Sequence, residues 1–151
     1  MSLTIQAEDP DAPEIRALLA AGEAYAAALY PVESNHFLDV AALRRPEVAF
    51  YVARRDGRAV GCGALVRQEN GCGELKRIFV DDAARGIGVG RRILAALEDH
   101  ARTAGLVCLR LETGVRSDPA LALYRAAGYR EIGPFGDYEA DPFSVFMEKR
   151  L

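Results

Sequence analysis

Hydrophobic and polar residues alternate in some stretches of the chain and recur every three or four residues in others. The first stretch, residues 3–8 (LTIQAE), alternates in the way that is typical of a short strand. An alanine- and leucine-rich run follows, with prolines near its start, and this run predicts a helix to about Leu29 that Pro31 ends. A shorter helical piece is expected at residues 39–44, where Asp39 is suited to cap it.

The middle of the chain has the pattern of antiparallel strands. Two β-rich runs within residues 48–66 are joined by Asp56-Gly57, a residue pair that favours a tight hairpin turn. A second turn at residues 69–73 (ENGCG) leads into residues 74–80 (ELKRIFV). The sequence therefore predicts a meander of three strands ending at Val80.

The pattern changes to helical spacing after residue 88. From Gly88 to about Ala104 the apolar positions recur every three or four residues, and Gly105 is a suitable stop. These positions predict one buried stripe, made of Val89, Ile93, Leu94 and Leu97. A mostly apolar strand follows at residues 106–113, and a strand, a crossover helix and a strand in that order place the two strands parallel.

The last third of the chain predicts one more helix and two strands. Ser117 or Asp118 is expected to cap the helix, which runs to Ala127 and is ended by Gly128. The final strands are expected at YREIG and SVFMEKRL, with the loop PFGDYEADPF between them. Helices and strands that alternate in this way predict an α/β fold.

Length and charge narrow the class of function. A chain of 151 residues fits one compact domain, and its net charge of −3 gives no indication of nucleic acid or an anionic membrane as the main partner. No window has the apolar length of a membrane span, and residues 1–10 lack the pattern of a targeting segment. We therefore expect a cytoplasmic protein whose partner is a small molecule.

The three cysteines, Cys62, Cys72 and Cys108, are odd in number and form no C-x-x-C pair. This spacing argues against a disulfide framework and against a zinc site, and no other metal site is predicted. Cys62 and Cys108 are expected in the core, and Cys72 in a turn.

Residues 81–94 (DDAARGIGVGRRIL) place three glycines at alternate positions just before the predicted helix. Glycine lets a ligand approach the main chain closely, and a helix start offers unpaired N–H groups to an anion such as a phosphate. A tight turn alone would need only one glycine. The G-x-G-x-x-G spacing of dinucleotide-binding folds is absent, and no P-loop lysine follows.

The segment Arg85-Gly86-Ile87-Gly88-Val89-Gly90 resembles the Q/R-x-x-G-x-G/A signature of the GNAT superfamily of acyl-CoA-dependent N-acyltransferases. The downstream ALYRAAGY and the order of elements are also similar to that family over nearly the whole chain. The resemblance implies a single N-acetyltransferase domain over residues 1–151. It also implies a mixed sheet of about six to seven strands flanked by about four helices, with acetyl-CoA as co-substrate.

The resemblance also assigns residues to the co-substrate. The main chain of the strand before the loop is expected to bind the pantetheine arm, and the glycine loop with its arginines the phosphates. Ser117 stands where many family members have an asparagine that contacts the co-substrate. The implied residues are Ile78, Phe79, Val80, Arg85, Gly86, Ile87, Gly88, Val89, Gly90, Arg91 (or Arg92) and Ser117.

The resemblance also implies catalytic roles for a tyrosine and two glutamates. Tyr124 is similar to the tyrosine that in many members protonates the departing thiolate. Glu74 and Glu112 are the candidates for the base that takes the amine proton, with Glu74 favoured by the family pattern, and a water is the third alternative.

The acceptor is expected to lie between two loops. Residues 31–37 (PVESNHF) offer Glu33 and Ser34, the last loop offers Phe135 together with Asp137 and Tyr138, and Glu112 completes this set of acceptor contacts.

We therefore expect transfer of an acetyl group from acetyl-CoA to a primary amine of a small molecule, by direct attack in a ternary complex. Two alternatives remain open: a non-catalytic acyl-CoA-binding regulatory module, and an acetyltransferase that acts on a protein amine. A homodimer is also compatible with the resemblance, since family members often pair.

Overall fold

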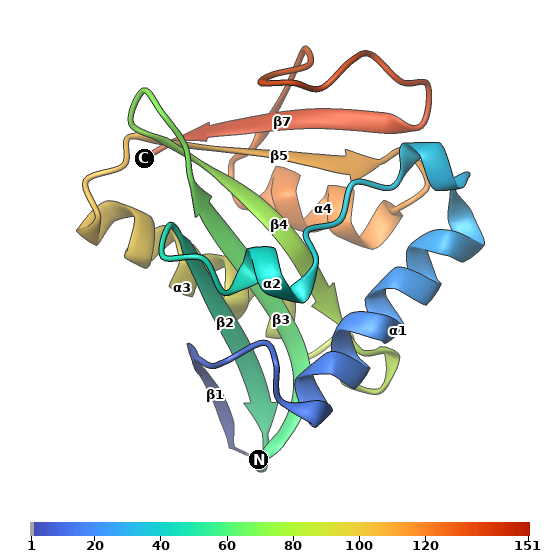
Figure 1. Ribbon diagram of the computed structural model, residues 1–151, viewed down its shortest axis with the longest axis vertical. Helices are drawn as coiled ribbons and strands as arrows, with labels where there is room; N and C mark the ends of the chain where they lie inside the picture. The colour runs from blue at the N-terminus through green and yellow to red at the C-terminus, as the bar shows by residue number, and fades with distance from the viewer. Residues whose placement is uncertain (1) are drawn as a thin grey trace.

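A computed structural model describes residues 2–151, which form one seven-stranded sheet in the order β1-β2-β3-β4-β5-β7-β6 (Figure 1). The strands are β1 (Leu3–Ala7), β2 (Val48–Arg55), β3 (Arg58–Arg67), β4 (Cys72–Val80), β5 (Cys108–Gly114), β6 (Arg130–Ile132) and β7 (Ser144–Arg150). The helices are α1 (Pro13–Leu29), α2 (Val40–Leu43), α3 (Val89–Thr103) and α4 (Asp118–Ala126), with 3-10 turns η1 (Val32–Ser34) and η2 (Asp82–Ala84). The expected mixed α/β fold is confirmed.

The predicted hairpin and meander are confirmed. Asp56 and Gly57 join β2 to β3 with φ angles of 51° and 85°, the two positive values that a type I′ turn requires. Asp39 caps α2, since its Oδ1 accepts a 2.8 Å hydrogen bond from the Ala42 amide.

One pair of neighbouring strands, β4 and β5, is parallel, and α3 crosses between them as expected. This pairing is short: it begins at Cys72 opposite Cys108 and ends at Leu75 opposite Leu111. The second half of β4 has no pairing with β5, so the two strands part within the sheet. The other neighbouring pairs are antiparallel.

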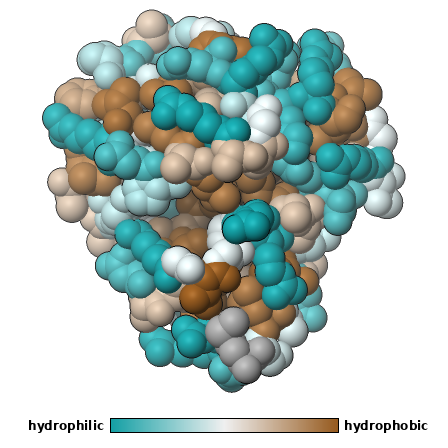
Figure 2. Space-filling model, turned by 180° about the vertical axis from the view of Figure 1, so that it is seen from behind, coloured by the Kyte–Doolittle hydropathy of each residue, from teal (hydrophilic) through white to brown (hydrophobic). Residues whose placement is uncertain are grey.

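The helices cover both faces of the sheet. On one face α1 and α2 bury an apolar cluster that includes Ile15, Leu19 and Leu43 against β2 and β3. On the other face α3 and α4 bury a larger cluster, which contains all four positions of the predicted stripe: Val89, Ile93, Leu94 and Leu97. Seen from behind, the surface shows separate hydrophobic areas between hydrophilic ones and is hollowed near its middle (Figure 2). The sheet is thus the middle layer of three.

The prediction that the cysteines form no disulfide is wrong. Cys72 lies in β4 rather than in a turn, and its sulfur is bonded to that of Cys108 with a Cα–Cα separation of 4.7 Å. The reason is strand register, because the first residues of the parallel pair face each other across the sheet. Cys62 is buried with a free thiol, as expected.

Ser117 occupies the N-cap position of α4, but its side chain makes no capping hydrogen bond. Its Oγ lies 2.7 Å from the Tyr30 hydroxyl, so the hydroxyl group that would have capped the helix holds the end of α1 instead. No helix within residues 2–151 has the length and apolar character needed to cross a membrane.

Candidate active site

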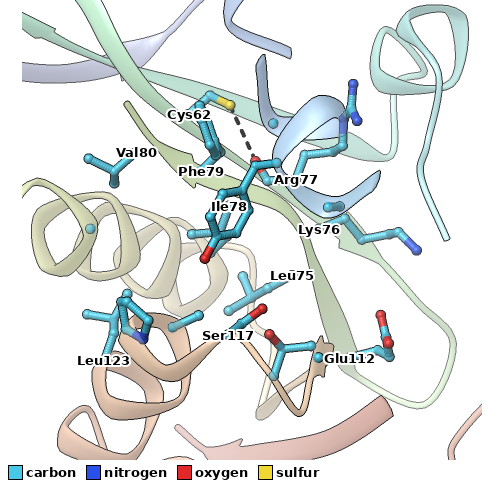
Figure 3. A pocket seen from close by; sticks show the side chains of 18 of the residues that line it. Cys62, Leu75, Lys76, Arg77, Ile78, Phe79, Val80, Glu112, Ser117 and Leu123 are labelled. Carbon is cyan, nitrogen blue, oxygen red and sulfur yellow. Dashed lines mark hydrogen bonds between the residues drawn. The ribbon is translucent and has the colours of Figure 1, made fainter. Parts of the chain in front are cut away.

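A cavity of about 370 Å³ lies where β4 and β5 part (Figure 3). Its walls come from the second half of β4, the end of β5, α1, the start of α3 and α4. Parted strands leave main-chain groups at a sheet edge without partners, and such an edge can bind an extended ligand as an added strand. Ile78, Phe79 and Val80 belong to this unpaired stretch and line the cavity.

A β-bulge interrupts β4 at Arg77. Lys76 lies opposite Ala64 and Phe79 opposite Cys62, so β4 has one residue more than β3 in this interval, and Arg77 has a φ of 59°. The carbonyl of Arg77 accepts a 3.3 Å hydrogen bond from the Cys62 thiol. The side chains of Lys76 and Arg77 diverge from the strand (Figure 3). Arg77 reaches Glu23 of α1, and Lys76 reaches Tyr138.

The glycine loop is open at two positions and closely packed at the third. Gly86 and Gly88 have φ angles of 82° and 84°, and a Cβ built on either would meet no atom within 4 Å. A Cβ on Gly90 would lie 3.1 Å from Leu123 of α4, so this glycine lets α3 and α4 approach. Two glycines thus expose main chain at the start of α3, where N–H groups favour an anion.

The loop residues divide between the cavity and its outer side. Arg85, Gly86, Val89 and Gly90 line the cavity, and Ile87, Gly88 and Arg91 do not. Arg85 forms a 2.9 Å ion pair with Asp82 and lies over the ring of Tyr25.

Tyr124 of α4 lines the cavity, as the sequence led us to expect. It is 5% exposed, and none of the hydrogen bonds among residues 2–151 involves its hydroxyl. Burial raises the pKa of this phenol, and the negative charge of Glu112 raises it further. The group therefore stays protonated at neutral pH and can donate a proton or a hydrogen bond.

Glu112, near the end of β5, lines the same cavity. Its Oε2 accepts a 2.7 Å hydrogen bond from Ser144 Oγ. Burial raises the pKa of this carboxyl group to about 7, while the Ser144 hydrogen bond and the charge of Lys76 act in the opposite direction. Such a carboxylate can both bind and release a proton near neutral pH.

Glu74 lies behind the cavity rather than on its wall. Its Oε2 accepts a 2.6 Å hydrogen bond from the Tyr138 hydroxyl, and the Lys76 amine lies 3.6 Å from the same oxygen. Lys76 also donates to the Tyr138 oxygen at 2.9 Å. Glu74 therefore positions Tyr138 and Lys76, both of which do line the cavity.

The structure brings together the two loops that were expected to hold the acceptor. Ser34 Oγ donates a 2.8 Å hydrogen bond to Asp141. The rings of His36 and Tyr138 pack edge to face, with their centres 5.3 Å apart. Ser34 lines the cavity. Glu33 and Phe135 do not line it, although the Phe135 ring packs on Tyr138.

Sequence reasoning missed Lys76 and Arg77, which both line the cavity. The available signal was two adjacent cations within the otherwise apolar strand ELKRIFV. Ser117 does line the cavity, close to the start of α4.

Comparison with known proteins identifies the family. The Acetyltransferase (GNAT) family matches residues 13–129. The chain is 49% identical over 151 residues to an IAA acetyltransferase of Azospirillum brasilense, covering 99% of both chains. It is 37% identical to the uncharacterized N-acetyltransferase YsnE of Bacillus subtilis, covering 80% of this chain and 82% of the relative.

Solved structures agree. A Klebsiella pneumoniae protein assigned to the acyl-CoA N-acyltransferases has a TM-score of 0.84 and 41% identity, covering 99% of this chain and 97% of that one. The PaiA N-acetyltransferase of Thermoplasma acidophilum, solved with coenzyme A, shares the fold with a TM-score of 0.77 and 16% identity, covering both chains fully.

The residues present fit an acyl-CoA: the glycine loop exposes main chain without side-chain obstruction, and the unpaired half of β4 adjoins it. The expected activity, N-acetyl transfer with acetyl-CoA as co-substrate, is confirmed at the level of the family. The chain belongs to the GNAT family of acetyltransferases.

Proposed function

We propose that the chain transfers the acetyl group of acetyl-CoA to a primary amine of a small molecule, by direct attack within the cavity between β4 and β5. The observation that carries this proposal is that Tyr124 and Glu112, which come from different elements, line one cavity with opposite proton-transfer properties. Tyr124 is a protonated phenol, and Glu112 is a carboxyl group that releases its proton near neutral pH.

The donor side of the proposal uses main chain. Ile78, Phe79 and Val80 would hold the pantetheine arm along the unpaired half of β4, and Gly86 and Gly88 would leave the N–H groups of the loop free for the pyrophosphate. N–H groups near Val80 would also polarise the thioester carbonyl. Contacts from Arg85, Ile87, Val89, Gly90, Arg91 and Ser117 remain predictions.

We assign the base to Glu112. An amine attacks as the neutral form, so a group must take its proton directly or through a water. Glu112 lines the cavity with a pKa of about 7, whereas Glu74 is held by Tyr138 behind the wall. Glu74 then acts as a positioning residue.

We assign the acid to Tyr124. As the carbon–sulfur bond of the thioester breaks, negative charge develops on sulfur, and a phenol that reaches the sulfur stabilises this charge or protonates it. Burial, together with the charge of Glu112, raises the pKa of the phenol and keeps it protonated until that moment.

Direct attack is favoured over a covalent intermediate by the state of Cys62. This is the free cysteine among residues 2–151, and burial raises the pKa of its thiol to about 12. Because the thiolate is the nucleophilic form, this cysteine is inert near neutral pH.

The acceptor is proposed to be small because the two loops close over the cavity. The Ser34–Asp141 hydrogen bond and the His36–Tyr138 contact join residues more than a hundred positions apart in the chain. A flexible protein segment would have to separate these contacts, while a small amine would fit beneath them.

Release of coenzyme A thiol from acetyl-CoA, measured with a panel of small amines and amino acids and with peptides bearing a free N terminus or a lysine, tests the proposal. We expect release with a class of small amines and little with peptides. Release with peptides alone would favour the protein-amine alternative. Stabilisation of the protein by acetyl-CoA with no release on any acceptor would favour the non-catalytic binding module.

A further inference from the structure

Arg77 is a buried cation on the wall of the cavity, placed there by the bulge in β4. Its side chain is 5% exposed. Its Nε is buried and has no hydrogen-bond partner among residues 2–151. A buried donor without an acceptor is costly, so native proteins seldom keep one that serves no purpose.

The contacts of Arg77 with the described part of the chain leave most of its donors free. One terminal nitrogen lies 3.3 Å from Glu23 of α1, a side chain that is itself half exposed. The guanidinium lies over the ring of Phe37, 5.0 Å from its centre. A guanidinium has five N–H donors in a planar fork that matches the two oxygens of a carboxylate.

Each of the three cations that line the cavity has a carboxylate partner, and Arg77 differs from the other two in its buried Nε, which has no acceptor among residues 2–151. Lys76 donates to Tyr138 and lies near Glu74, and Arg85 pairs with Asp82. Among the described residues that line the cavity, one carboxylate, Glu112, stands against three cations. Since the pKa of Glu112 is raised to about 7, much of its population is uncharged at neutral pH. The partners of the three cations, Glu74, Glu23 and Asp82, do not line the cavity, so the charged groups that face it are mostly cationic.

We infer that Arg77 recognises a carboxylate on the acceptor, so that the acceptor is an amine that also carries a carboxylate group. Aromatic rings also line the cavity, those of Phe37, on which Arg77 lies, and of His36, Tyr138 and Phe143, and they fit an apolar or aromatic remainder. This inference rests on the proposed function, because it names the substrate class of that same site.

The first test compares acceptors that differ only at the carboxylate. Thiol release is measured for phenylalanine, tyrosine and leucine, for their amides, and for the decarboxylated amines. We expect kcat/KM for an amino acid to exceed that of its amide and its decarboxylated amine by about tenfold or more. If the decarboxylated amines react as well or better, the inference is wrong and the proposed function stands. If neither class reacts but another small amine of the panel does, the inference is wrong and the proposed function stands; if no small amine reacts, the proposed function itself fails.

The second test assigns the preference to Arg77. Arg77→Met should lower kcat/KM for the amino acid by about tenfold or more, with little change for the decarboxylated amine and for the KM of acetyl-CoA. Arg77→Lys keeps the charge without the fork and should retain part of the preference. Glu23→Gln is the matched control: it removes the charge of the existing partner of Arg77 and should leave the preference intact. An equal loss for both acceptors in Arg77→Met would contradict the inference.

An inhibition measurement with a probe that cannot be acetylated separates recognition of the carboxylate from acetyl transfer. Cooperative thermal unfolding of each variant excludes misfolded samples. The probe is 3-phenylpropanoate, which has the carboxylate but no amine to acetylate. It should inhibit competitively against the amino acid in the wild type and in Tyr124→Phe, and should lose this effect in Arg77→Met samples whose thermal unfolding is cooperative. Inhibition that survives Arg77→Met, or that is absent from the wild type, would overturn the proposed role.

Discussion

Ser144 Oγ donates a 2.7 Å hydrogen bond to Oε2 of Glu112, joining the start of β7 to the end of β5 beside the cavity. This bond stabilises the ionised carboxylate, while burial acts against it. The balance leaves the pKa of Glu112 at about 7, which is the range in which a carboxylate can serve as base for an amine.

The pH dependence of activity should report this balance. Because the base must be ionised, kcat/KM should rise with pH and level off above a midpoint near the Glu112 pKa of about 7. Ser144→Ala removes a hydrogen bond that lowers this pKa, so the midpoint should move to higher pH. The measurement is the pH profile of thiol release for both proteins.

Replacing the carboxylates separates the two candidates for the base. Glu112→Gln should abolish the rise near pH 7 and lower kcat by about a hundredfold. Glu74→Gln should keep the rise, because this residue acts on Tyr138 and Lys76. If Glu74→Gln loses the rise near pH 7 and Glu112→Gln keeps it, the base is Glu74, as the sequence analysis favoured.

Tyr124→Phe should lower kcat by about a hundredfold with little change in the binding of acetyl-CoA. The hydroxyl makes no hydrogen bond to residues 2–151, so its removal should also leave the unfolding temperature nearly unchanged. Calorimetric titration with acetyl-CoA, together with steady-state kinetics, checks both parts. Full turnover in this variant would remove Tyr124 from the mechanism.

Gly88→Ala and Gly57→Ala form a matched pair. The two glycines have φ angles of 84° and 85°, and an added Cβ would meet no atom within 4 Å at either position. Each variant should therefore lose about 1–2 kcal/mol of stability from backbone strain. Only Gly88→Ala, in the loop before α3, should weaken acetyl-CoA binding. Equal affinity of the two variants for acetyl-CoA would show that the loop before α3 does not bind the co-substrate.

The Cys72–Cys108 bond should be measurable by counting thiols. Under denaturing conditions the oxidised protein should show one reactive thiol, that of Cys62, and the reduced protein three. The bond joins residues 36 positions apart in the chain. Closing a loop of this length lowers the entropy of the unfolded chain, which gives a stabilisation of up to about 4 kcal/mol. Reductant should lower the unfolding temperature of the wild type by several degrees, and Cys72→Ser/Cys108→Ser should not respond. Three thiols without reductant would contradict the pairing.

Local signals in the sequence were enough to predict most of the elements. Asp56-Gly57 fixed a hairpin because its turn type depends on these two residues alone, and the spacing of Val89, Ile93 and Leu97 reflects a single helix face. The glycine loop was recognised for the same reason, since its geometry is local.

The features that sequence reasoning missed depend on register between distant segments. Cys72 and Cys108 meet because β4 and β5 begin opposite each other, and no spacing rule reveals that alignment. Arg77 enters the cavity through a bulge whose position is set by pairing with β3. Glu74 was favoured over Glu112 by the family pattern, and only the contact with Tyr138, which holds Glu74 behind the cavity, distinguishes the two.

The central claim is direct transfer inside one cavity that holds donor and acceptor together. Initial rates of thiol release, measured over a grid of acetyl-CoA and amine concentrations, test it most directly. The account predicts double-reciprocal lines that intersect, because both substrates must be bound before the acetyl group moves. Parallel lines, the signature of a covalent acetyl-enzyme, would contradict it.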